Sequence, residues 1–256
     1  MRFETYIPCV ALKPYIKQFV IAEQAESLPY KVLPGASLVV GFQYRGKLNI
    51  IMNEKPEALA KAGITGLMDK YKLFLNSENI GTVLVYFTET GASHFFKIPL
   101  NELFSQSISL DSIIPASTIK IILERLANAD NDIKRIAVIE QFFISQLNPD
   151  IHDKLVEEAI RLIKTSAGTI RISDLASQLC ISQSRLEKRF RIIVGATPKK
   201  FASITRLHHL IENKGQNLTM TELGYTAGYF DQSHFIKDFR NFTGETPESF
   251  FLGNIK

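Results

Sequence analysis

Six polar side chains occur in two sets that share the same spacing and chemistry. Each set has an amide, a hydroxyl and an ammonium group at positions i, i+1 and i+5. The residues are Gln183, Ser184 and Lys188 in the first set and Gln232, Ser233 and Lys237 in the second. Amide and ammonium groups can hydrogen-bond to the edges of adenine and guanine in a DNA major groove. We therefore expect these side chains to contact DNA bases.

The two sets belong to an internal repeat. Shifting the chain by 49 residues places residues 182–198 on residues 231–247, and eight of these seventeen positions are identical. Because a solenoid needs at least about three repeats, this pair excludes one. The alternative is a helical bundle whose duplication reflects only common ancestry, but such a bundle gives no reason for exposed polar groups to recur.

Each copy predicts a short helix, a tight turn and a second helix, which together form a helix-turn-helix unit. Ser182 and Asp231 are suited to cap the start of the second helix. Gly195 and Gly244 supply the left-handed residue that ends it. The preceding short helices are expected over residues 172–179 and 220–227, and a longer helix is expected to begin at Pro198.

Positive charge is concentrated around the first unit. Residues 185–206 hold seven basic residues and one acid, whereas the whole chain has a net charge of only +4. Binding to a polyanion requires such local charge. Basic residues near helix ends are expected to contact phosphates, because positioning contacts gather there. They are Arg185, Arg191, Lys199, Lys200, Arg206 and Arg240.

Residues from about 150 to 252 resemble the DNA-binding domain of the AraC/XylS family of bacterial transcription regulators. The likeness is carried by Leu175, Ala176, Ser182, Leu186, Phe190, Gly195, Pro198 and Arg206, and then by residues 228–235, Lys237, Phe239, Gly244 and Pro247. The resemblance implies seven helices, with recognition helices in successive major grooves. It implies helix-turn-helix units at about 171–193 and 219–243, joined by a linker helix at about 198–213. The chain departs from the family pattern at Gly224, where alanine is usual, and in the polar segment 211–214.

The first half has mixed periodicity. Runs of β-branched and aromatic residues predict strands within 31–44, 46–52 and 80–88, with a hairpin turn at 44–47. Apolar residues three and four apart predict helices over 117–127 and 132–147. Asn148-Pro149-Asp150 interrupts this pattern. We therefore expect two domains, an α+β domain over 1–148 and an all-α domain over 149–256.

The first half is similar to the N-terminal domain of one AraC-type subgroup. The similar segments are 8–19, 32–35, 81–87 and 93–99. The resemblance implies a β-rich, cupin-like sensor or dimerisation module. Our hypothesis is that residues 1–148 bind a small effector in an apolar pocket, whose residues the sequence does not identify, or pair two chains through the helices at 115–147. More than half of the phenylalanines lie in this half, and filling the core is the alternative explanation for them.

Enzyme signatures are missing from the sequence. Residues 41–47 nearly form a phosphate-binding loop, but Leu48 stands where a Ser or Thr would hold magnesium. The five histidines lack metal-ligand spacing. We expect no catalysis, no cofactor and no metal. Two alternatives stay open: an enzyme, such as a DNA-repair protein, that uses this domain for targeting, and a non-specific architectural DNA-binding protein.

The composition is that of a globular protein, with 45% apolar and 22% charged residues. Cys9 and Cys180 alone cannot form a disulfide framework. The N-terminus lacks an apolar signal core, and the apolar runs are too short to span a bilayer. We expect a cytoplasmic bacterial transcription regulator that does not enter a membrane. Its expected partners are double-stranded DNA, a small-molecule effector, a second copy of the chain and, if it is an activator, RNA polymerase.

Overall fold

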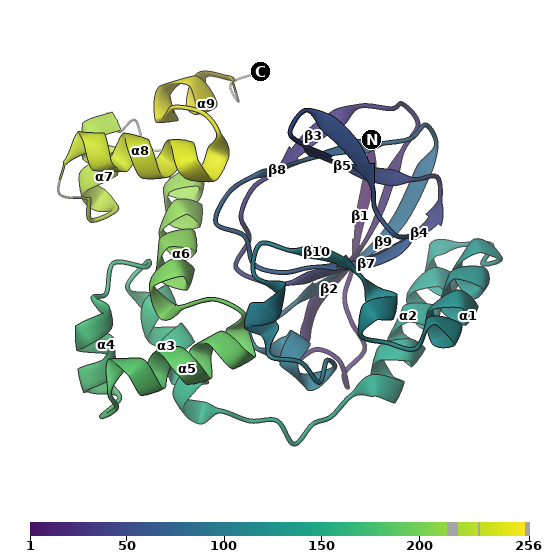
Figure 1. Ribbon diagram of the computed structural model, residues 1–256, viewed down its shortest axis with the longest axis horizontal. Helices are drawn as coiled ribbons and strands as arrows, with labels where there is room; N and C mark the ends of the chain where they lie inside the picture. The colour runs from purple at the N-terminus through teal and green to yellow at the C-terminus, as the bar shows by residue number, and fades with distance from the viewer. Residues whose placement is uncertain (214–219, 230, 254–256) are drawn as a thin grey trace.

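The computed structural model describes residues 1–213, 220–229 and 231–253, and Figure 1 shows how they are arranged. A β-rich half with two covering helices lies beside a helical half (Figure 1). Lys214 and Phe230, which the sequence analysis places at the end of the linker helix and in the second turn, lie outside the described residues.

Ten strands, among the residues described, form two antiparallel sheets. They are β1 (Arg2–Tyr6), β2 (Ile16–Gln24), β3 (Pro29–Val32), β4 (Val39–Arg45), β5 (Leu48–Met52), β6 (Lys55–Ala58), β7 (Ala62–Thr65), β8 (Lys72–Asn76), β9 (Ile80–Phe87) and β10 (Ser107–Ser109). The larger sheet has the order β1-β2-β9-β4-β7-β10, and the smaller one has the order β3-β8-β5-β6. The expectation of a β-rich N-terminal half is therefore confirmed.

The predicted hairpin at 44–47 is wrong, although the chain does turn there. β4 pairs with β7 and β9, whereas β5 pairs with β6 and β8, so the turn passes the chain from one sheet to the other. Gly46 has a φ of +75°, and a Cβ at this position would lie 2.8 Å from the Cα of Ile80. Local alternation predicted both strands, but it carries no information on which distant strands become their partners.

The two faces of the larger sheet have different neighbours. Helices α1 (Ala116–Ala127) and α2 (Asp132–Gln146) lie close to the predicted ranges and cover the outer face. There the buried Phe42 packs edge-on against Phe142, with ring centroids 6.1 Å apart. Gly41 and Gln43 alternate with Phe42 along β4 and line a cavity on the opposite, inner face. Side chains along β4 therefore alternate between the core beneath α1 and α2 and the wall of the cavity.

Seven helices follow in the described part of the C-terminal half, as the resemblance implied. They are α3 (Lys154–Thr165), α4 (Ile172–Gln178), α5 (Gln183–Val194), α6 (Pro198–Asn213), α7 (Met220–Thr226), α8 (Gln232–Thr243) and α9 (Pro247–Gly253). No helix within the described residues is both long enough and apolar enough to cross a membrane.

A short segment connects the two halves between the end of α2 at Gln146 and the start of α3 at Lys154. The proposed boundary at residues 148–149 falls inside it. This segment is held to the β-rich half at Asn148, whose N–H donates to the carbonyl oxygen of His94 over 2.8 Å. The Nδ1 atom of His94 lies 3.0 Å from the carbonyl oxygen of Asn148. The different roles assigned to residues 1–148 and 149–256 stay predictions.

Candidate nucleic-acid interface and effector cavity

Helix α5 is built as the sequence analysis of the first copy predicts. The Ser182 Oγ accepts a hydrogen bond from the Arg185 N–H over 3.4 Å, and the helix ends at Gly195 with a φ of +91°. Leu186 and Phe190 are fully buried on one face. The first set of three polar side chains lies on the exposed surface of this helix.

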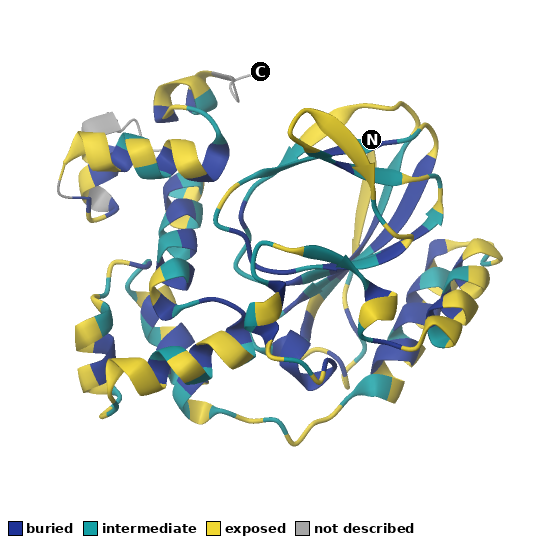
Figure 2. Ribbon diagram, in the orientation of Figure 1, coloured by how far each residue is buried: buried dark blue, intermediate teal, exposed yellow. Residues whose placement is uncertain are grey.

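Helix α8 repeats this construction. The Asp231 Oδ1 accepts from the His234 N–H over 2.7 Å, and Gly244 ends the helix with a φ of +80°. Phe235 and Phe239 are buried, and the second set of polar side chains is exposed. In Figure 2 exposed residues recur along both α5 and α8. All six candidate base contacts therefore point to solvent, and their contacts with DNA stay a prediction.

The helix α6 holds the two units at its opposite ends (Figure 1). The Thr197 Oγ1 caps it by accepting from the Lys200 N–H over 3.2 Å, and Thr246 caps α9 in the same way, from the Ser249 N–H over 3.3 Å. At 1.5 Å per residue α6 is about 24 Å long. With a recognition helix at each end, its length suits the repeat of about 34 Å between major grooves on one face of B-DNA.

The six candidate phosphate contacts fall into two groups. Exposed side chains form the first group, which comprises Arg185, Arg191, Lys199 and Arg240. Lys200 and Arg206 are half-buried and have intramolecular partners. Lys200 Nζ lies 2.8 Å from an Asp69 carboxylate oxygen. Arg206 donates to the Gly168 carbonyl oxygen over 2.8 Å and lies over the Tyr229 ring. A phosphate contact by Lys200 or Arg206 would require these contacts to break, and all six assignments stay predictions.

The β-rich half contacts the linker helix and the second helix-turn-helix unit through segment 66–71, which joins β7 to β8. The Asp69 carboxylate pairs with Lys200, and the Asn241 Nδ2 donates to the Asp69 carbonyl oxygen over 3.2 Å. Burial raises the pKa of Asp69, but the ammonium of Lys200 and the hydroxyl of Ser105 outweigh this effect, and the net pKa is lowered. One residue thus contacts the linker helix and the second recognition helix.

Both helix-ending glycines abut the β-rich half. A Cβ at Gly195 would lie 3.1 Å from the carbonyl oxygen of Leu100, in the 3₁₀ helix η2 (Leu100–Leu103) that packs on α5. A Cβ at Gly244 would lie 2.5 Å from the ring of Tyr71. Beside Gly244, the Glu245 carboxylate forms an ion pair with Lys31. Gly195 and Gly244 occupy the same position of the repeat, but they lie against different elements of the N-terminal half.

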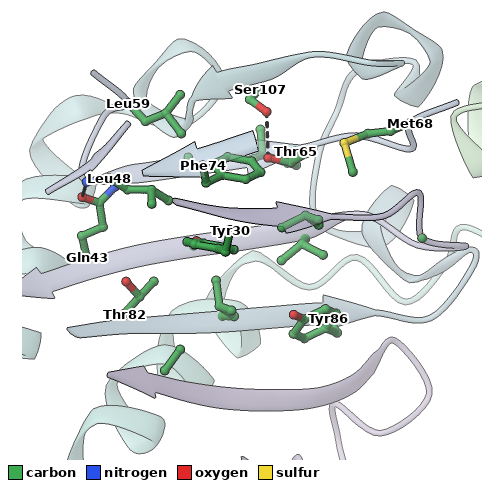
Figure 3. Close-up of a pocket in the computed structure, with 18 of the residues that line it drawn as sticks. Tyr30, Gln43, Leu48, Leu59, Thr65, Met68, Phe74, Thr82, Tyr86 and Ser107 are labelled. Carbon is green, nitrogen blue, oxygen red and sulfur yellow. Dashed lines mark hydrogen bonds between the residues drawn. The ribbon is translucent and has the colours of Figure 1, made fainter. Parts of the chain in front are cut away.

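A cavity of about 380 Å³ lies between the two sheets (Figure 3). Large apolar and aromatic side chains line most of it, including Tyr30, Leu59, Met68, Phe74 and Tyr86. A second hollow of about 230 Å³ shares several of these lining residues. Burial, together with the neighbouring Tyr86, raises the pKa of Tyr30 to about 12, and burial also raises the pKa of Tyr86. Both phenols are therefore neutral at physiological pH.

The cavity wall contains few polar groups. The Gln43 amide donates to the Ala60 carbonyl oxygen and accepts from the Leu48 N–H, each over 2.9 Å, so its two ends are occupied by backbone. The hydroxyls of Thr65 and Ser107 lie 3.0 Å apart (Figure 3). Apolar walls with a few convergent polar groups are typical of small-molecule sites.

Known protein families match segments in both halves of the chain. The family described as "Helix-turn-helix domain" matches residues 175–252, and "Domain of unknown function (DUF6597)" matches residues 4–109. The chain is 29% identical over 120 residues to the Msm operon regulatory protein of Streptococcus mutans, which is 44% of this chain and 42% of that protein. It is 24% identical over 97 residues to the HTH-type transcriptional regulator ArgR of Pseudomonas aeruginosa, or 38% and 30% of the two chains. These matches span less than half of either curated relative.

The helical half matches the helix-turn-helix family over residues 175–252, and this match supports its resemblance to the AraC/XylS regulators. The structure of ToxT from Vibrio cholerae superposes on 98% of this chain and 98% of its own, with a TM-score of 0.50 at 12% identity. At that identity the superposition shows a shared fold. The expected fold, with a β-rich N-terminal half and a helical C-terminal half, is therefore confirmed.

One departure from the AraC/XylS sequence pattern has a structural explanation. A Cβ at Gly224 in α7 would lie 3.2 Å from the ring of Phe235 in α8. This distance is tighter than most real contacts, so the usual alanine would have to push that ring back. The glycine lets α7 and α8 approach closely at a cost of about 1 kcal/mol in helix propensity.

The sequence predicts an apolar pocket in the first half but does not identify the residues that line it. The signal that could have found them is the small residues at inward positions of strands. Ala22, Gly41 and Gly63 line the cavity from three strands of the larger sheet. Small side chains on one face of a sheet leave space against the opposite sheet that larger side chains would fill.

Proposed function

We propose that this protein is a sequence-specific DNA-binding transcription regulator of the AraC/XylS type that reads two successive major grooves. One observation carries the proposal. Two helices with the same caps and the same buried face present the same amide, hydroxyl and ammonium groups to solvent, at opposite ends of one packed linker helix. The regulators to which the chain is similar support the same function.

Footprinting of the purified full chain on its own genomic DNA tests this proposal. We expect protected sites that contain two recognition elements about one helical turn apart, because α5 and α8 lie at opposite ends of one helix. Uniform protection without a recurring sequence would instead indicate an architectural DNA-binding protein and would refute specific recognition.

We further propose that an effector in the cavity controls DNA binding. Segment 66–71 supports this coupling because some of its residues line the cavity and others contact the helical half. Gly66 and Met68 line the cavity, whereas Asp69 and Tyr71 contact α6, α8 and the residue that ends α8. The Ser105 N–H also donates to the Leu67 carbonyl oxygen over 2.7 Å, just after η2, which packs on α5. A ligand that moves this segment changes the contacts of α6 and α8 directly and the packing of η2 on α5 indirectly.

A cavity-filling substitution tests the effector site. Gly41 lines the cavity, and a Cβ there would make only ordinary contacts, the nearest 3.4 Å from a Leu84 methyl group. Gly41→Leu places a branched side chain in the space, whereas the matched control Gly41→Ala adds one carbon. We expect Gly41→Leu alone to abolish ligand-induced thermal stabilisation in a small-molecule screen. Equal ligand binding by both variants would place the effector elsewhere.

The helices α1 and α2 support a second copy of the chain as a partner. Ile121, Ile133 and Ile144 are exposed on these two helices, with 56%, 75% and 49% of their surface accessible. We propose that they contribute to a homodimer, and that RNA polymerase is contacted only if the protein is an activator. Light scattering of the full chain and of the triple variant Ile121→Gln, Ile133→Gln, Ile144→Gln tests the dimer, since a wild-type monomer refutes it.

A further inference from the structure

One polar cluster of the cavity retains hydrogen-bonding capacity after the domain has folded. It comprises Thr65, Lys72 and Ser107, and we call it the ammonium–hydroxyl cluster. The Lys72 Nζ donates to the Ser107 Oγ over 2.9 Å, and the hydroxyls of Ser107 and Thr65 share a hydrogen bond of 3.0 Å. Thr65 and Ser107 both line the cavity. The cluster therefore joins a cation to the cavity surface.

Lys72 is directed inward by the strand that carries it. Side chains on β8 alternate between two faces, so Lys72 shares its face with Phe74 and Asn76. Phe74 lines the larger hollow and Asn76 the smaller one. Lys72 is half-buried, and burial is the cause that lowers the pKa of its ammonium group. In the described part of the chain, no carboxylate lies within ion-pair distance of Lys72 to offset this burial.

The amide and the two other lysines near the cavity are already occupied. The amide of Gln43 is held at both ends by backbone groups. Lys31 pairs with Glu245 across the interface between the two halves, and Lys200 pairs with Asp69. Lys72 differs from these two lysines because its partner is a neutral hydroxyl. An ammonium group that has one neutral partner keeps two N–H donors and its full charge.

We infer that the ammonium–hydroxyl cluster binds the head group of a monoanionic amphiphile, with a carboxylate at the cluster and an apolar tail in the cavity. The inference rests on the proposed effector site and names its ligand class. A single ammonium group compensates a single negative charge, and a dianion would leave a desolvated charge without a partner. The ammonium and hydroxyl donors match the several acceptor sites of a carboxylate. The aromatic and aliphatic walls suit the tail, because burial of apolar surface is favourable.

The position of the ammonium–hydroxyl cluster would couple a bound head group to the docking of the DNA-binding half. Thr65 ends β7, and segment 66–71 begins at the next residue. Lys72 follows the same segment and begins β8. A carboxylate at the cluster would therefore contact both ends of the segment whose residue Asp69 contacts the linker helix α6 and the second recognition helix α8. An uncharged ligand would fill the cavity without this attachment.

Calorimetric titration of the full chain with decanoate and 1-decanol tests the inference, because the two ligands share a tail and differ in charge. We expect decanoate to bind about tenfold to a hundredfold more tightly than decanol, as hydrogen bonds to a charged group contribute more than neutral ones. Lys72→Met should remove this preference while it keeps the length of the side chain. Lys70→Met, at an exposed lysine two residues away, is the matched control and should retain the preference. Decyl phosphate should bind more weakly than decanoate at pH 8.

Three outcomes would overturn the inference. They are equal binding of decanoate and decanol to the wild type, a preference that survives Lys72→Met, and tighter binding of decyl phosphate than of decanoate. Binding of both ligands without discrimination would overturn the inference and still support the effector cavity. No binding of either would refute the inference, and the small-molecule screen with the Gly41 variants would then decide on the effector cavity separately. If Lys72→Met does not fold, Lys72→Arg and Ser107→Ala decide the question, since the first should keep the preference for decanoate and the second should reduce it.

Discussion

The two helix-turn-helix units share a framework but attach differently to the β-rich half. Their N-caps, buried aromatic residues and terminal glycines correspond position by position. They differ at the positions that face the other half. Ile192 and Ala196 of the first unit correspond to Asn241 and Glu245 of the second. Asn241 donates to Asp69, and Glu245 pairs with Lys31. The shared residues therefore maintain the helix pair, and the divergent ones determine how each unit docks.

The largest expected effect tests whether the two cores are equivalent. Phe190 and Phe239 occupy the same repeat position and are both at most 1% exposed. Phe190→Ala and Phe239→Ala should each lower the free energy of unfolding by about 3–5 kcal/mol, since each removes a buried ring and leaves a cavity. Urea unfolding of the full chain measures both losses. A loss below about 1 kcal/mol in one variant would show that only one unit depends on its aromatic core.

The next effect tests whether both recognition helices read bases. Lys188→Ala and Lys237→Ala should each weaken specific DNA binding by roughly 1–3 kcal/mol and relax preference at one base step, a different step for each variant. Footprint titration on a single operator measures the affinity and the position. An unchanged sequence preference in either variant would remove that helix from the recognition surface.

A smaller effect tests the asymmetry of docking. Asp69→Asn removes the charge that holds Lys200, whereas Lys31→Met removes the contact with Glu245 of the second unit alone. Both ion pairs are partly exposed, so each loss should be below about 1 kcal/mol. The pKa of Asp69 is lowered, so its contribution is complete at neutral pH and is lost as the pH falls through the folded-state pKa.

Limited proteolysis at pH 7 in the connecting segment 147–153 measures how far the two halves separate when these ion pairs are lost. Asp69→Asn should increase cleavage more than Lys31→Met, because Asp69 holds the linker helix α6, to which both units are attached, whereas Lys31 holds the second unit alone. Glu78→Gln, at an exposed position in the turn between β8 and β9, provides the control for loss of one acidic charge. Equal cleavage of all three variants and the wild type would contradict a docking role for Asp69.

The smallest effect separates phosphate contacts from base contacts. Lys199 is exposed at the start of α6, next to the occupied Lys200. Lys199→Ala should weaken binding to all sequences alike and reduce the slope of log affinity against log salt by about one. DNA affinity measured at several salt concentrations between about 50 and 200 mM gives this slope. A change in sequence preference would instead assign Lys199 to base recognition.

Local chemistry made the helical half predictable. Caps such as Asp231 and left-handed glycines such as Gly195 act within a few residues, so the sequence indicates where each helix starts and ends. The exposure of the six polar side chains follows from the same pattern, because the buried positions fix the orientation of each helix. The duplication also revealed the second unit, whose first helix alone is too short to be distinctive.

Long-range contacts explain what the sequence did not reveal. The strand at 39–45 was predicted, but its partners β7 and β9 depend on residues far along the chain. The cavity requires Ala22, Gly41 and Gly63 to lie on the same face of the larger sheet, which only the strand order establishes. Arg206 looked like a phosphate contact from its charge, but its partners Gly168 and Tyr229 come from other elements.

The short connection between Gln146 and Lys154 has a consequence for how quickly the protein could respond. A tether of this length keeps a released DNA-binding half near its docking surface at an effective concentration in the millimolar range. Individually weak contacts, such as those of Asp69 and Lys31, then suffice to hold the halves together and to re-form rapidly. A ligand that alters the docking equilibrium by only a few kilocalories per mole would therefore redistribute the population between two reversible arrangements.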